Sequence, residues 1–434
     1  MKSCLNINYV SVLYKIPKGE QGILTILFFL LPVFFLTIKS WTNTISVLLA
    51  ILSIYKISKN FRHYFLRRGL YFWTLLLLIA TPFLSEIAIQ VLRGPFTAKA
   101  LDGPSRFLLG GVIFIFLSRN NRCLEIFKIF ALGCLFSVFI TFLSVFFVRD
   151  YFWGDRAATY FVDPNSLPVY TGILSCISFF YLEKAIQKNL IKWAIIILII
   201  MSYLYVIHIS QTRTSWLPAF LLLTYILTRK TKAPFACCTF IVLGLTLIAF
   251  LFYKTNFLFQ KRADDIFFAI KHMSNGNFST SSLSVRVNIM LAELSLIKGS
   301  PVLGYPDGAI PSYLTCKEMS PTLDETAYFC LNKAGSHCEI LAQLVRKGLF
   351  LGATAVFSLF IFPALIFLRG VFFNDKKASE VSRTSVCVVI MLIISSLGIQ
   401  VFNLKMYSGF WAIFIGLIYS VLSNYENNKL KRKY

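Results

Sequence analysis

Residues 193–228 carry the sequence WAIIILIIMSYLYVIHI–SQTRTS–WLPAFLLLTYILT. Two apolar runs, Trp193–Ile209 and Trp216–Thr228, are separated by a short polar break that contains Arg213. A helix of roughly 17–25 apolar residues is long enough to cross the hydrocarbon core of a bilayer. An arginine at hydrocarbon depth costs several kcal/mol unless it faces protein, water or an anion. The stretch therefore predicts two membrane helices, with Arg213 turned away from lipid between them.

The rest of the chain repeats this pattern. Hydrophobic residues make up 57% of the sequence and charged residues 14%, which is more apolar surface than a soluble core needs. Since only helices and closed barrels satisfy their backbone inside a bilayer, we expect an all-α polytopic membrane protein, residues 1–434 forming one membrane-embedded domain. About twelve transmembrane helices are predicted, at 22–38, 42–57, 70–91, 105–118, 124–148, 165–182, 193–209, 214–228, 235–253, 348–368, 385–402 and 405–423.

The formal net charge of +24 is a topology signal. Lysine and arginine gather in alternate short connections, which by the positive-inside rule face the cytoplasm. Both chain termini then lie in the cytoplasm, and the distribution argues against a nucleic-acid partner. The basic connections are residues 59–68, 119–122, 184–192, 229–232, 369–383 and 429–433.

One long hydrophilic segment, residues 254–347, separates the ninth and tenth predicted spans, on the extracytoplasmic side. Loops of this length usually bind ligands or carry catalytic groups. We expect an interfacial helix over 257–272, a serine-capped helix from Ser281 or Ser284 to Ile297, and irregular structure over 311–335. Ser336 is the expected N-cap of the next helix, which places His337 at the start of that helix.

Four candidate functional residues fall on this extracytoplasmic side: Arg156, Arg213, Arg286 and His337. Each has two readings. Arg213 either binds a pyrophosphate or snorkels to lipid phosphates, and Arg286 is either a phosphate ligand or a solvated charge on a helix face. His337 is either a catalyst or a structural histidine, and Arg156 either touches substrate or pairs with its neighbour Asp155. Together, fixed cations and a titratable imidazole at a membrane surface favour transfer chemistry on a phosphorylated lipid.

The sequence lacks the motifs that are typical of several other function classes. The sequence contains neither a Walker-type loop nor a dinucleotide-binding glycine motif, so nucleotide hydrolysis is disfavoured. There is no Asp-x-Asp pair and no Cys/His cluster of metal-ligand spacing, so no metal and no cofactor are predicted. Glu86 is the clear acidic residue within a span, which is too little for a proton-coupled transport relay. A disulfide between Cys316 and Cys330 is an open alternative in the long segment.

The motifs around Arg213, Arg286 and His337 resemble those of the bacterial O-antigen ligase family, within the superfamily that also contains the O-antigen polymerases. Two departures are visible: Cys338 follows the histidine where the family usually has Asn, Ser or Gln, and Leu351 stands where its second glycine is usual, with Gly352 next. The matching motifs are Thr212-Arg213-Thr214 after a span, Leu283-Ser284-Val285-Arg286 opening a helix, Ser300-Pro301 with Gly304, and His337 followed by Gly348.

The resemblance implies a GT-C-like, metal-independent, inverting glycosyltransferase of the bacterial cell inner membrane, with its active site in the periplasm. The implied donor is an undecaprenyl-diphosphate-linked O-polysaccharide, and the implied acceptor is a sugar hydroxyl of lipid A–core. Arg213 and Arg286 would bind the diphosphate, together with Arg156, and His337 would act as general base on the acceptor hydroxyl or position it.

Two alternatives stay open. An O-antigen polymerase uses similar chemistry with a growing glycan as acceptor, although the spacing from His337 to Gly348 favours a ligase. A transporter of lipid-linked sugar would use the same cations as a substrate groove and would need no base. Loss of His337 would therefore spare a transporter and inactivate a ligase.

Overall fold

The computed structural model describes residues 20–228 apart from 67, 95, 149, 154 and 155, then 282–306 and 325–431, with a few isolated residues between 253 and 268. Eight helical stretches within these ranges are long and apolar enough to cross a membrane, which confirms a polytopic, almost entirely helical membrane protein. The predicted span at 235–253 and most of the predicted interfacial helix at 257–272 lie outside the described residues.

The described helices follow the apolar runs of the sequence closely. They are α2 (Glu20–Val33), α3 (Trp41–Lys59), α4 (Phe61–Phe65), α5 (Leu70–Arg93), α6 (Ala98–Leu101), α7 (Arg106–Leu117), α8 (Cys123–Phe147), α9 (Ser166–Ala185), α10 (Asn189–Ser210), α11 (Trp216–Thr228), α14 (Ser282–Gly299), α16 (Glu325–Ala334), α17 (Glu339–Val356), α18 (Phe362–Val371), α19 (Lys376–Ser396) and α20 (Lys405–Lys431). A π-helical turn, η3 (Phe357–Ile361), joins α17 to α18, and a two-stranded antiparallel hairpin, β1 (Asp150–Trp153) and β2 (Arg156–Ala158), follows α8.

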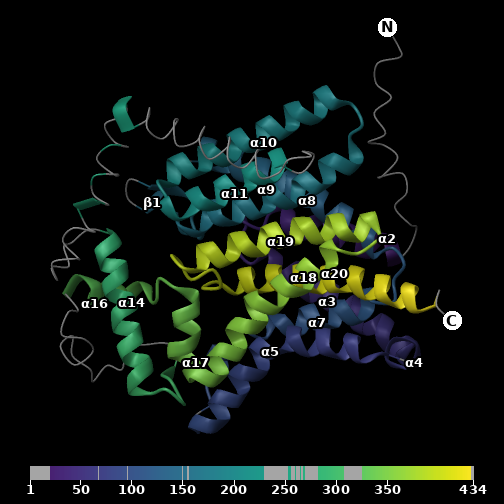
Figure 1. Ribbon diagram of the computed structural model, residues 1–434, viewed down its shortest axis with the longest axis horizontal. Helices are drawn as coiled ribbons and strands as arrows, with labels where there is room; N and C mark the ends of the chain where they lie inside the picture. Colours follow the sequence, from purple (N-terminus) through teal and green to yellow (C-terminus); the bar gives the residue numbers. More distant parts are fainter. Residues whose placement is uncertain are drawn as a thin grey trace.

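Helix α20 runs through the middle of the bundle (Figure 1), and its apolar window is buried along its whole length. Small residues let α7 lie directly against it: a Cβ added at Gly110 would lie 2.5 Å from the Ala412 carbonyl oxygen, and one at Gly416 would lie 2.7 Å from that of Gly110. Such small-residue contacts are how membrane helices pack closely without a hydrophobic driving force.

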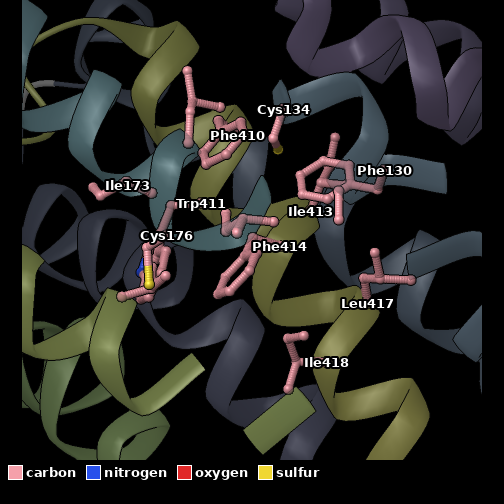
Figure 2. Close-up of a cluster of buried hydrophobic side chains, with 14 of the residues drawn as sticks. Phe130, Cys134, Ile173, Cys176, Phe410, Trp411, Ile413, Phe414, Leu417 and Ile418 are labelled. Atoms are coloured by element: carbon pink, nitrogen blue, oxygen red, sulfur yellow. The ribbon is translucent and has the colours of Figure 1, made fainter. Parts of the chain in front are cut away.

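Aromatic side chains fill the space on the other faces of α20. Figure 2 shows Phe410, Trp411 and Phe414 of α20 together with Phe130 of α8 and Cys176 of α9. All five side chains are buried, and the indole N–H of Trp411 donates to the Leu359 carbonyl at 3.1 Å. Large apolar side chains remain exposed on most of the long apolar helices, α3, α5, α8, α10 and α18 among them, where lipid would cover them.

Helices α14 and α16 stand at one side of the bundle, beyond α17 (Figure 1), around a small core of their own. The predicted helix from Ser281 or Ser284 to Ile297 is confirmed as α14. The expectation of irregular structure over 311–335 is wrong for Glu325–Ala334, which form α16, and residues 311–324 lie outside the described part of the chain. Helix α16 forms there because Ala327 and Leu331 pack against Ile289 of α14 and Val345 of α17.

Helix α17 bends at Gly348, whose φ of +74° is a left-handed conformation that glycine adopts readily. The turn-rich segment after α14 packs into this bend: the Leu349 N–H donates to the Pro301 carbonyl and the Tyr305 N–H to the Val345 carbonyl, both at 2.7 Å. Gly304 also has a positive φ, and a Cβ there would lie 2.5 Å from the Val345 carbonyl oxygen. These contacts join the bend to the segment after α14, and together they orient the first half of α17 toward α14.

Candidate functional site

The polar break between α10 and α11 is a tight turn. Helix α10 ends at Ser210, Gln211 adopts a left-handed φ of +50°, and Arg213 opens a single 3-10 turn, η1 (Arg213–Ser215), that leads into α11. The hydroxyl of Thr212 donates to the Pro164 carbonyl at 2.5 Å, which fixes the turn to the segment before α9. Arg213 is thereby held, half-buried, between the end of α10 and the start of α11.

Arg156 supports this turn from the β-hairpin. Its guanidinium donates to the Ser210 carbonyl at 2.8 Å, to the Thr212 hydroxyl at 2.8 Å and to Asn165 Oδ1 at 2.9 Å. The alternative of a local pair with Asp155 lies outside the described residues. Arg156 thus holds Thr212, the residue before Arg213, in place and is a positioning residue for Arg213.

The structure brings Arg286 of α14 to Arg213, although 72 residues of chain separate them. Burial and the neighbouring positive charge of Arg213 lower the pKa of Arg286. The connection between α19 and α20 lies against both arginine segments. A Cβ added at its Gly398 would lie 2.7 Å from the Thr214 methyl and 3.9 Å from Arg286 Nη1. The half-buried guanidiniums of Arg213 and Arg286 therefore repel one another, and an anion bound between them would relieve this repulsion.

His337 completes the group. Burial and the nearby Arg286 lower the pKa of its imidazole to about 4, while the carboxylate of Asp163 opposes the shift. An imidazole with this pKa is neutral at physiological pH and can accept a proton. The predicted residues Arg213, Arg286 and His337 therefore converge on one place, and Arg156 braces the turn beside them.

Asp163 belongs to the same cluster and was not singled out from the sequence. Its Oδ1 accepts the backbone N–H groups of Asn165 at 2.9 Å and Ser166 at 3.0 Å, at the start of α9. Its Oδ2 is buried and has no hydrogen-bond partner among the residues that the structure describes. The motif Asp-Pro-Asn-Ser is a recognisable helix-start signal, but nothing in it reveals that the carboxylate acts on the distant His337.

Glu293 is the second acidic group that sequence patterns left unassigned. It is 2% exposed on α14, and burial raises the pKa of its carboxyl to about 8, against an opposing effect of the nearby Ser336 hydroxyl. Its neutral carboxyl lies beside the segment that carries His337. A buried carboxyl with a shifted pKa next to candidate catalytic groups is typical of functional sites.

The predicted role of Ser336 as helix N-cap is wrong. Helix α17 begins at Glu339 with Cys338 in the N-cap position, and His337 lies before the helix. The hydroxyl of Ser336 instead serves the turn: it accepts the Cys338 N–H at 3.0 Å and donates to the Cys338 carbonyl at 2.8 Å. Glu339 is then anchored on both oxygens, by Gln343 at 2.7 Å and by the Phe402 N–H at 3.1 Å.

Two further expectations concern metals and cysteines. Across the described ranges, no three side chains of His, Cys, Asp or Glu gather as metal ligands. Cys330 is a free thiol, and its suggested partner Cys316 lies outside the described residues. Comparison with known proteins finds no family that matches the chain and no curated protein that matches it.

Proposed function

We propose that this protein is an O-antigen ligase of the bacterial inner membrane, a metal-independent inverting glycosyltransferase. The observation that carries the proposal is the convergence of Arg213, Arg286 and His337, from three distant segments, at one end of a membrane-spanning bundle. The donor would be O-polysaccharide on undecaprenyl diphosphate and the acceptor lipid A–core, with the reaction on the periplasmic face.

In this proposal the two guanidiniums bind the diphosphate of the donor. An acceptor hydroxyl oxygen attacks the anomeric carbon from the face opposite the diphosphate. The bond between that carbon and the diphosphate oxygen breaks, and its electron pair leaves on the diphosphate, where Arg213 and Arg286 stabilise the added charge. The neutral imidazole of His337 takes the proton of the hydroxyl. Attack opposite the leaving group inverts the anomeric centre.

Gel electrophoresis of lipopolysaccharide tests the proposal. The gene is deleted in its own host and restored as wild type or as His337→Ala. We expect core without O-antigen in the deletion and in His337→Ala, accumulation of lipid-linked polymer, and a full ladder with wild type. His63→Ala is a matched control, because His63 is an exposed histidine on α4, far along the chain from the site.

The other outcomes separate the alternatives. Core capped by a single repeat unit would identify an O-antigen polymerase instead. A full ladder with His337→Ala would remove the base from the mechanism and favour transport. In a reconstituted assay, Arg213→Gln and Arg286→Gln should each lower the transfer rate by about 10²–10³-fold, since each removes a donor from the developing charge.

A further inference from the structure

A cavity of about 430 Å³ opens at the end of the bundle opposite the candidate site. It lies between the start of α2, the end of α3, α4 and the connection from α7 to α8. Figure 1 has α4 at the right of the view and β1 and α14 at the left. The cavity is lined by Gln21, Leu24, Lys56, Tyr64, Phe116, Arg119, Asn120, Asn121 and Arg122.

The lining is cationic. Lys56, Arg119 and Arg122 contribute three positive charges, and none of the described lining residues is acidic. The acidic side chain nearest in sequence to these arginines, Glu125, pairs with Lys128 at 2.9 Å. Three cations among the described lining residues create a positive potential that attracts an anion.

A further arginine strengthens this field from behind the cavity wall. Arg68 donates to the Tyr64 carbonyl at 2.6 Å and to the Ser118 hydroxyl at 2.7 Å, and burial together with Arg119 lowers its pKa to about 10. Arg119 itself donates to the Leu66 carbonyl at 3.0 Å. Arg119 Nε and Arg68 Nη1 are both buried without a hydrogen-bond partner among the described residues. Arg119 and Arg122 line the cavity, and the planar N–H groups of a guanidinium match the geometry of a phosphate.

Exposed apolar side chains lie on α4 and on the chain that follows it, next in sequence to the lining residue Tyr64. Phe61 of α4 is 60% exposed, Leu66 directly after α4 is 59% exposed, and Leu70, the first residue of α5, is 83% exposed. Exposed apolar groups beside a row of cations mark the boundary between hydrocarbon and headgroups, and basic pockets between membrane helices bind anionic lipid headgroups there. We propose that this cavity binds the phosphate headgroup of an anionic phospholipid, with its acyl chains along the exposed apolar surface of α4 and α5.

Native mass spectrometry of the full chain in detergent tests this directly. Wild type should bind one phosphatidylglycerol in preference to phosphatidylethanolamine. The triple variant Lys56→Gln, Arg119→Gln, Arg122→Gln should bind phosphatidylglycerol about a hundredfold more weakly, since each cation near a headgroup contributes roughly fivefold. The control triple Lys39→Gln, Lys376→Gln, Lys377→Gln removes the same charge at exposed positions outside the cavity lining and should bind as wild type does.

The remaining outcomes decide against the proposal or change the source of the phosphate. Equal weakening in both triple variants would mean that net charge alone attracts lipid. Equal binding of phosphatidylethanolamine and phosphatidylglycerol by wild type, a comparison that needs no variant, would also overturn the proposal. Competition by inorganic phosphate at the affinity of the lipid would assign the cavity to a free anion. Each variant is compared only after it elutes as a single folded species.

Discussion

At the scale of single residues, the site depends on how its neighbours change the protonation of His337 and Glu293. Burial acts on both groups, but in opposite directions on their pKa values, because it disfavours the charged form of each. The imidazole becomes harder to protonate, and the carboxyl becomes harder to deprotonate. Both groups therefore start neutral near pH 7, the imidazole able to accept a proton and the carboxyl to hold one.

The low pKa of His337 depends partly on Arg286. In wild type we expect the imidazole to titrate near pH 4 and to stay neutral above that pH. Arg286→Gln removes one positive neighbour and should raise the pKa of His337 by about one unit, because less repulsion opposes the imidazolium. NMR of the labelled histidines in the detergent-solubilised chain measures this without requiring activity.

Arg369→Gln is the matched control for this titration. Arg369 of α18 pairs at 2.8 Å with Glu426 in the last turns of α20, so its loss should leave the pKa of His337 unchanged. A shift of equal size in both variants would show that Arg286 has no local effect on the imidazole.

Glu293 should make stability depend on pH. Its pKa is about 8 in the folded protein against an ordinary value of 4.5, so between these values the folded state holds a proton that the unfolded state has released. Stability contributed by this proton is complete below pH 4.5 and is lost as the pH rises toward 8. Glu293→Gln should therefore unfold like wild type at pH 4.5 and be about 1–3 kcal/mol more stable at pH 8. Thermal unfolding in detergent at both pH values measures the difference in stability between the variant and wild type. An equal difference at pH 4.5 and at pH 8 would contradict the assigned pKa.

At the scale of elements, the bend of α17 depends on Gly348. A Cβ at Gly348 would collide with the Val302 carbonyl, and the backbone there is left-handed. Gly348→Ala should therefore destabilise the protein by about 2 kcal/mol or more, through both the collision and the disfavoured conformation. The midpoint of thermal unfolding reports the loss. Gly69→Ala is the control, since a Cβ there meets nothing within 4 Å.

The pair Glu86–Lys347 ties α5 to α17 just before that bend. The two side chains are 3% and 2% exposed, their charged atoms lie 3.3 Å apart, and Lys347 also donates to the Ser85 hydroxyl at 3.1 Å. Glu86→Gln should cost about 3–5 kcal/mol, because it leaves a buried ammonium without its counter-charge. The double variant Glu86→Leu, Lys347→Leu should recover much of this loss. A double variant as unstable as the single one would mean that the pair itself, rather than the unpaired charge, is what the fold needs.

At the scale of the whole molecule, the bilayer explains why most helices were predictable. Apolar runs such as Leu70–Arg93 and Cys123–Phe147 begin and end close to the predicted limits, because water and lipid impose those limits directly. The span predicted at 385–402 is displaced, since α19 begins at Lys376. Its first turns contain serines whose hydroxyls donate to carbonyls one turn earlier, as Ser382 does to Ala378 at 2.8 Å, so they are buried without being apolar.

The candidate site was predictable only in part for a related reason. Arg213, Arg286 and His337 share one side of the membrane in the charge pattern, so their meeting could be anticipated. The roles of Asp163 and Glu293 depend on burial by segments far away in sequence. Helix α16 was missed for the same reason, since its few apolar residues are buried in a cluster shared with α14 and α17, which lie elsewhere in the sequence.

The central position of α20 constrains how this protein is made. Every other described helix is synthesised before α20, yet α20 occupies the middle of the finished bundle. While translation proceeds, the surfaces of α7 and α8 that will receive it lack their partner, so the nascent chain must keep an open slot within the bilayer. Final compaction is therefore a late step of biogenesis, and until α20 inserts, the immature bundle presents the face that a membrane-embedded chaperone or protease would recognise.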